Sequence, residues 1–152
     1  MHRTGLLAAS LGIGLFAGAC SSERSTGFSE GISGTAAKTV RGGTTVRGSH
    51  GEKLVLYKPG HVKIERGHSE SMRVRIKREN FDDAVRVSMT QLPQGVEAVD
   101  MPRETHSDTI EVVLRADPQA ALVKDHEALV TVEGPQDMRA TEAFKVSVRQ
   151  RD

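Results

Sequence analysis

Apolar and polar residues alternate along most of the chain between Gly51 and Asp152. The clearest run is Met72-Arg73-Val74-Arg75-Ile76-Lys77. Successive side chains of a strand point to opposite faces, so this run predicts a strand with one buried face and one charged face. The same alternation predicts further strands at 54–56, 62–64, 85–89, 110–114, 130–132 and 144–148.

Turn-forming residues separate these strands, among them Lys58-Pro59-Gly60, Pro93-Gln94-Gly95 and Gly134-Pro135. Proline interrupts a strand because it lacks a backbone N–H, and glycine adopts the conformations that tight turns need. About seven short strands in roughly 100 residues are typical of two packed antiparallel sheets. The sequence therefore predicts an all-β fold, a single antiparallel β-sandwich over residues 51–152.

A different pattern occupies the N-terminus. Two polar residues, His2 and Arg3, precede a charge-free apolar segment that runs from Leu6 to Phe16. A helix that crosses a bilayer needs about 20 apolar residues, so this segment is too short to span one. The small residues Ala17-Gly18-Ala19 then lead to Cys20, the one cysteine of the chain. This order is typical of an export signal that is removed from the mature protein.

The run Ala17-Gly18-Ala19-Cys20 resembles the lipobox of bacterial lipoproteins. The resemblance implies that residues 1–19 are a lipoprotein signal peptide and that Cys20 is the lipidation site, its thiol linked to diacylglycerol. The mature protein would then be exported and held at the bacterial cell envelope by a lipid anchor, since two or more acyl chains anchor stably. Ser21 follows the cysteine, where an aspartate would favour the inner membrane, so the outer membrane is the expected location. Ala17 departs from the leucine that is commonest there, and an ordinary secretory signal cut near Ala19 is the alternative.

Residues 20–50 are rich in serine, glycine and threonine, and their few apolar residues show no period. Such a segment cannot bury enough apolar surface to offset the entropy of ordering it. The sequence therefore predicts that the lipidated Cys20 begins a flexible stalk, which ends at about residue 50.

The predicted sandwich resembles the immunoglobulin-like domains of bacterial envelope and surface proteins. The resemblance covers about residues 52–150 and rests on the strand rhythm, the Leu92-Pro93-Gln94-Gly95-Val96 turn and the terminal Phe144-Lys145-Val146-Ser147-Val148 strand. The chain differs from antibody domains because it has no tryptophan and no cysteine pair. Its core must therefore be held by aliphatic side chains, methionine and phenylalanine alone.

Charge and motifs exclude several classes of function. The chain has 21 Lys and Arg against 20 Asp and Glu, which is not the strongly basic balance of a nucleic-acid-binding domain. His61 and His68 lie at opposite ends of one predicted strand, too far apart to share a metal ion. The sequence contains no catalytic or phosphate-binding motif. We therefore expect no catalytic residue, no metal site, no cofactor, no nucleic-acid partner and no enzymatic activity.

Three cationic residues, Arg73, Arg75 and Lys77, share one face of one predicted strand. We call them the basic ladder. With Arg86 of a neighbouring strand it forms a candidate anion-binding face. The alternative is an ordinary solvated face whose cations pair with Glu65 and Glu111 across strands.

Two functions are compatible with these features. The first is a membrane-tethered, non-enzymatic structural or protein-interaction module of the bacterial cell envelope, with an envelope protein as its partner. The second is a module that binds cell-wall or surface polysaccharide through the basic face. The scarcity of aromatic residues, which are 3% of the chain, favours the first because sugar-binding modules stack rings on aromatic side chains.

Overall fold

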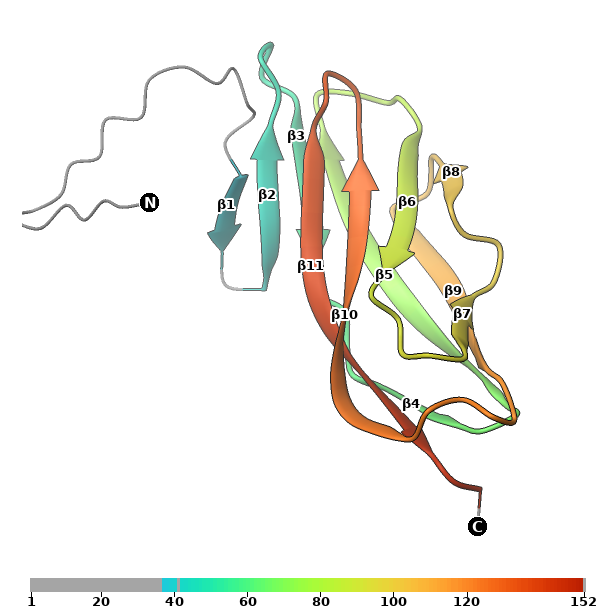
Figure 1. Cartoon of the computed structure of the whole chain (residues 1–152). Coiled ribbons are helices and arrows are strands. Elements are labelled where there is room, and N and C mark those ends of the chain that lie inside the picture. The colour runs from blue at the N-terminus through green and yellow to red at the C-terminus, as the bar shows by residue number, and fades with distance from the viewer. Residues whose placement is uncertain (1–36, 41, 152) are drawn as a thin grey trace, which may run out of the picture. The chain divides into compact units, whose positions relative to one another are not determined.

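A computed structural model describes residues 37–40 and 42–151. The predicted signal peptide, Cys20 and most of the predicted stalk lie outside the described residues. The described part is built from strands, turns and loops arranged in two sheets (Figure 1). Its strands are β1 (Ala37–Val40), β2 (Gly43–Arg47), β3 (Lys53–Tyr57), β4 (Val62–Glu65), β5 (Ser69–Glu79), β6 (Val85–Thr90), β7 (Val96–Ala98), β8 (Arg103–Thr105), β9 (Thr109–Ala116), β10 (Val123–Glu133) and β11 (Arg139–Arg149).

The strand order defines the fold. The first sheet has the order β1-β2-β3-β5-β9-β7 and the second has the order β4-β11-β10-β6-β8. In an immunoglobulin constant-type domain, strands A, B, E and D form one sheet and strands C, F and G form the other. Strands β3, β5, β9 and β7 occupy the places of A, B, E and D, and β6, β10 and β11 occupy those of C, F and G. The predicted all-β, immunoglobulin-like sandwich is confirmed.

Each sheet gives one face to the core, which lies between them (Figure 1). Val74 of β5 and Val130 of β10 have no exposed surface, and Phe144 of β11 is 2% exposed. Strand β5 has the burial pattern that its alternating sequence predicts, with Met72, Val74 and Ile76 inside. Burial of apolar side chains therefore holds the sheets together, at about 25 cal/mol per Å² removed from water.

The chain changes sheets between β3 and β4. Strand β3 pairs with β5 in the first sheet, whereas β4 pairs in parallel with β11 at the edge of the second sheet. The connection is the predicted turn at 58–60, in which Pro59 is buried. This crossover brings His61 and β4 beside the C-terminal strand.

The sandwich begins earlier than the predicted boundary at residue 51. Residues 37–40 and 43–47 belong to the predicted stalk, but they form the β1–β2 hairpin, and β2 pairs with β3. Val46 is fully buried, and a Cβ added to Gly43 would lie 2.2 Å from the Leu56 carbonyl oxygen. Glycine is thus needed for close approach of β2 to β3, although its abundance here resembles that of a flexible linker.

Candidate functional site

The basic ladder has the orientation that the sequence predicts. Arg73, Arg75 and Lys77 are all exposed on the outer face of the first sheet. Arg86 is also exposed, but it belongs to β6 of the second sheet. The outer faces of two packed sheets point in opposite directions, so the structure does not bring Arg86 to the ladder. Grouping these four residues on one face was wrong, because strand order rather than alternation decides which sheet a strand joins.

Two of the ladder cations have partners on the first sheet. The guanidinium of Arg75 lies 4.9 Å from the centroid of the Tyr57 ring. Lys77 Nζ lies 2.7 Å from Oε1 of Glu79, and Lys53 Nζ lies 3.0 Å from Oε2 of the same carboxylate. Hydrogen bonds donated by Lys77, which has the larger effect, and by Lys53 lower the pKa of Glu79. The same contact with Glu79 raises the pKa of Lys77.

The ladder cations do not form the expected ion pairs with Glu65 and Glu111. Glu65 lies in β4 of the second sheet, and Lys77 pairs instead with Glu79, two residues along its own strand. Glu111 does oppose Arg73 in the β5–β9 register, yet no ion pair within 4.0 Å joins them. Of the ladder cations, Arg73 alone has no ion-pair or ring partner within residues 42–151.

A second group of polar side chains, which no pattern in the sequence predicts, lies on the outer face of the second sheet. The Ser147 hydroxyl of β11 is 2.9 Å from Nε2 of His61, and Oδ1 of Asp125 is 3.5 Å from the same nitrogen. The backbone N–H of Asp125 donates to the Ser147 hydroxyl over 2.9 Å. Ser147 is only 5% exposed although its neighbours Lys145 and Arg149 are exposed.

A β-bulge in β10 covers Ser147. Val123 is opposite Val148 and His126 is opposite Val146, so two residues of β10 face one residue of β11. Bulges bend a strand and redirect its groups. Asp125 sits in the bulge with a φ of 54°, a left-handed conformation that is uncommon for a residue other than glycine. The bulge turns the N–H of Asp125 onto the Ser147 hydroxyl.

The geometry of this group differs from that of a catalytic triad. In a triad, serine and the carboxylate bind different nitrogens of the histidine ring, so that one nitrogen takes the proton while the other is held by the acid. Here both Ser147 and Asp125 are at Nε2 of His61. The arrangement positions the bulge and the β4 crossover, and it does not prepare a nucleophile.

The same residues form part of a pocket of about 550 Å³. Its apolar lining comes from Leu122, Val123 and Val148. Three cations surround it, from three separate segments: Lys63 of β4, Lys124 of the bulge and Arg149 of β11. The volume is within the range of about 300–1,000 Å³ that is common for ligand pockets. This Ser147 pocket can hold a ligand that carries both an apolar group and negative charge.

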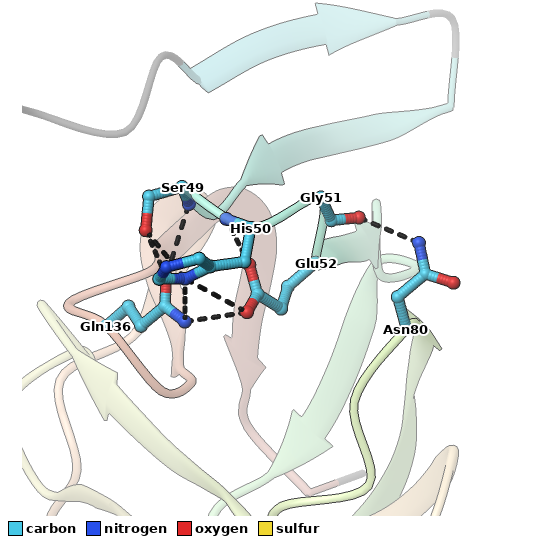
Figure 2. Close-up of polar contacts among 6 residues, drawn as sticks. All are labelled: Ser49, His50, Gly51, Glu52, Asn80 and Gln136. Carbon is cyan, nitrogen blue, oxygen red and sulfur yellow. Dashed lines mark hydrogen bonds and ion pairs between the residues drawn. The ribbon is translucent and has the colours of Figure 1, made fainter.

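A third polar cluster lies at the end of the sandwich (Figure 2). The Gln136 side chain accepts a hydrogen bond from the Ser49 hydroxyl at 2.7 Å and donates to Glu52 at 2.6 Å. Backbone N–H groups of Glu52 and His50, together with the Gln136 amide, lower the pKa of Glu52. The cluster ties the β2–β3 turn to the β10–β11 hairpin, which is a structural role.

Nearby, the Asn80 side chain donates to the Gly51 carbonyl at 2.8 Å (Figure 2). This bond links the end of β5 to the same β2–β3 turn. Within the described ranges, 37–40 and 42–151, there is no group of three or more side chains suited to hold a metal ion. The part of the chain that the structure describes contains no helix long and apolar enough to cross a membrane.

No family model matches the sequence, and no curated protein matches it. Among solved structures, an immunoglobulin domain from the titin M10–obscurin-like 1 complex superposes with a TM-score of 0.42 and 14% identity, covering 67% of this chain and 99% of that chain. A chimeric titin Z1Z2, which carries an exogenous peptide from decorin, superposes with a TM-score of 0.40 and 12% identity, covering 64% of this chain and 95% of that one. The immunoglobulin-like assignment rests on the strand order described above.

Proposed function

We propose that the protein is a membrane-tethered, non-enzymatic interaction module of the bacterial cell envelope. The lipobox-like sequence that ends at Cys20 supports the tether. The sandwich has an apolar core that contains no cysteine, which suits an exported domain with a single cysteine.

The observation that carries the interaction role is the Ser147 pocket. Its polar side chains fix a bulge and leave cations and an exposed leucine around a concave surface. Leu122 is 51% exposed, which is the largest exposure among the big apolar side chains of the described residues. An exposed apolar side chain at the rim of a charged pocket favours binding of a protein partner over catalysis.

The alternative function, binding of a cell-wall or surface polysaccharide by the basic face, has one observation in its favour. Arg73 is exposed and has no ion-pair partner within the described residues. Against it, Arg75 is stacked on Tyr57, Lys77 is paired with Glu79 and Arg86 lies on the other sheet. The interaction module is therefore the better-supported proposal.

The tether is tested by replacing Cys20 with serine in the full-length chain. The wild-type protein should incorporate a labelled fatty acid and sediment with membranes, and Cys20→Ser should do neither. The matched control is Ser21→Ala, which changes a neighbouring small polar residue and should leave both properties intact. A mature wild-type N-terminus that carries no acyl mass would contradict the proposal.

The interaction role is tested in cells by site-specific photo-crosslinking. A photoreactive amino acid at position 122 should yield a discrete protein adduct. The same group at position 86, in β6 of the second sheet and outside the pocket, should not. Adducts that are equal at the two positions, or none at position 122, would argue against the pocket as an interaction surface.

A further inference from the structure

The Ser147 pocket carries positive charge that the protein itself does not neutralise. Lys63, Lys124 and Arg149 are exposed, and no ion pair within 4.0 Å involves any of them among residues 42–151. The one carboxylate of the lining, that of Asp125, lies beside His61 at 3.5 Å. A negatively charged group in this pocket would meet three side-chain cations that have no ion-pair partner among residues 42–151. Its hydrogen bonds to them would be about twice as strong as those between neutral groups, because both partners are ionised.

The pocket also has a substantial apolar lining. Val123 packs against the hydrophobic core, Val148 is 2% exposed, and Leu122 projects at the rim with half of its surface in water. A ligand with charge alone would leave Leu122 uncovered. A ligand with an apolar side chain beside its charge would remove that surface from water, at about 25 cal/mol per Å².

The shape of the pocket is fixed before any ligand arrives. The Ser147 hydroxyl holds both the Asp125 N–H and His61 at 2.9 Å, and these bonds fasten the bulge to β11 and to the crossover before β4. A preformed site binds with less loss of conformational entropy than one that must be ordered by its ligand.

Two observations favour a peptide over a polysaccharide. None of the lining residues is phenylalanine, tyrosine or tryptophan, so the pocket offers no platform of this kind for sugar rings. Beside the pocket, β4 is the edge strand of its sheet and pairs with β11 on one side. An edge strand presents free backbone groups that an extended peptide can pair with.

We infer that the Ser147 pocket binds an extended acidic segment of a partner protein, in which carboxylate side chains alternate with apolar ones. The carboxylates contact Lys63, Lys124 and Arg149, and an apolar side chain covers Leu122. This inference rests on the proposed interaction role and specifies the chemistry of the partner.

The test uses the mature chain with Cys20→Ser, labelled with ¹⁵N, and a short synthetic peptide that alternates glutamate and leucine. Addition of the peptide should shift the backbone amide signals of residues 61–63, 122–125 and 147–149. The glutamine–leucine analogue, which lacks charge, and polyglutamate, which lacks apolar groups, should each bind at least about tenfold more weakly.

Matched variants locate the site. Lys124→Gln with Arg149→Gln should weaken peptide binding by about a hundredfold, since each cation supplies a charge-assisted contact worth about tenfold. Arg73→Gln with Arg75→Gln removes the same charge from the other sheet and should leave binding unchanged. Both pairs are exposed, and dispersed amide spectra check that each variant is folded. Lys63→Gln supplies a single-site variant should the first pair fail to fold.

Several outcomes would overturn the inference. They are the absence of shifts at the pocket, equal binding of the glutamine–leucine analogue, and loss of binding in the Arg73/Arg75 variant rather than in the pocket variant. Equal binding of an anionic wall polymer at the pocket would replace the peptide with a glycan. If the peptide does not bind but the photo-crosslinked adduct at position 122 still forms, only the inference of an acidic partner segment is overturned. Failure of both experiments overturns the interaction role as well.

Discussion

The Arg75 guanidinium lies 4.9 Å from the centre of the Tyr57 ring, and this contact joins β5 to β3 on the outer face of the first sheet. A cation above an aromatic face at an exposed site contributes about 0.5–1 kcal/mol. A double-mutant cycle with Tyr57→Leu and Arg75→Gln should therefore give a coupling energy of that size in denaturant unfolding. Strictly additive effects of the two changes would contradict the contact.

Val74 and Arg75 are neighbours in β5 with opposite environments, which provides a sharp test of the register. Val74 is fully buried, so Val74→Asp places an unpaired charge in the core and should cost at least about 3 kcal/mol of the free energy of unfolding. Arg75→Asp stays in water, loses the contact with Tyr57 and should cost about 1 kcal/mol. Thermal or denaturant unfolding measures both. Equal effects would mean that β5 is shifted by one residue.

The carboxylate of Glu79 should make stability depend on acid pH. Its pKa is lowered in the folded state by Lys77 and Lys53, so the unfolded chain binds more protons in the range between the two pKa values. The stabilisation is present above the ordinary glutamate pKa of about 4.3 and is lost as the pH falls through the lowered folded value. Glu79→Gln should therefore lower the melting temperature at pH 7, and its difference from wild type should shrink below about pH 4.

The control for this experiment is Glu127→Gln, since Glu127 is exposed and has no ion pair within residues 42–151. Its melting temperature should stay near that of wild type at both pH values. At the alkaline end, Glu79 raises the pKa of Lys77, so the stabilisation is complete below the ordinary lysine pKa of about 10.4 and is lost as the pH rises through the raised folded value. A Glu79→Gln difference that did not depend on acid pH would show that the ion pairs do not contribute.

Strands β5 and β9 were predictable because their buried and exposed residues alternate with a clear period of two, whereas only residues 130–132 of β10 were predicted. Strand β5 alternates over its buried residues, and the 92–96 turn forms with a hydrogen bond of 2.9 Å from the Val96 N–H to the Pro93 carbonyl. Strands β7 and β8 have three residues each, too few for a period to be recognised. Strand β2 buries only Thr44 and Val46 on the core side, so its composition resembles that of a linker.

The candidate site was less predictable for two physical reasons. Sheet membership depends on long-range strand order, and so Arg86 could not be separated from the ladder by alternation. Ser147 stands at a position that alternation assigns to solvent, yet the β10 bulge covers it. No local residue pattern marks the bulge, since Asp125 adopts a positive φ without a glycine beside it. The pocket follows from tertiary contacts between segments that are far apart in the sequence.

Removing the charge of the basic ladder decides between the two candidate functions. The variant that changes Arg73, Arg75 and Lys77 to glutamine removes three exposed charges from the first sheet. If the ladder bound an anionic wall polymer, retention of the wild-type mature chain on isolated cell wall would fall with added salt, because exposed charges are screened beyond about 8 Å at physiological ionic strength. Since Arg75 and Lys77 already have partners, we expect the triple variant to melt slightly earlier than wild type and to show the same weak retention. Salt-sensitive retention of the wild type that disappears in this variant, but persists in the Lys124/Arg149 variant, would assign the function to the ladder instead of the Ser147 pocket.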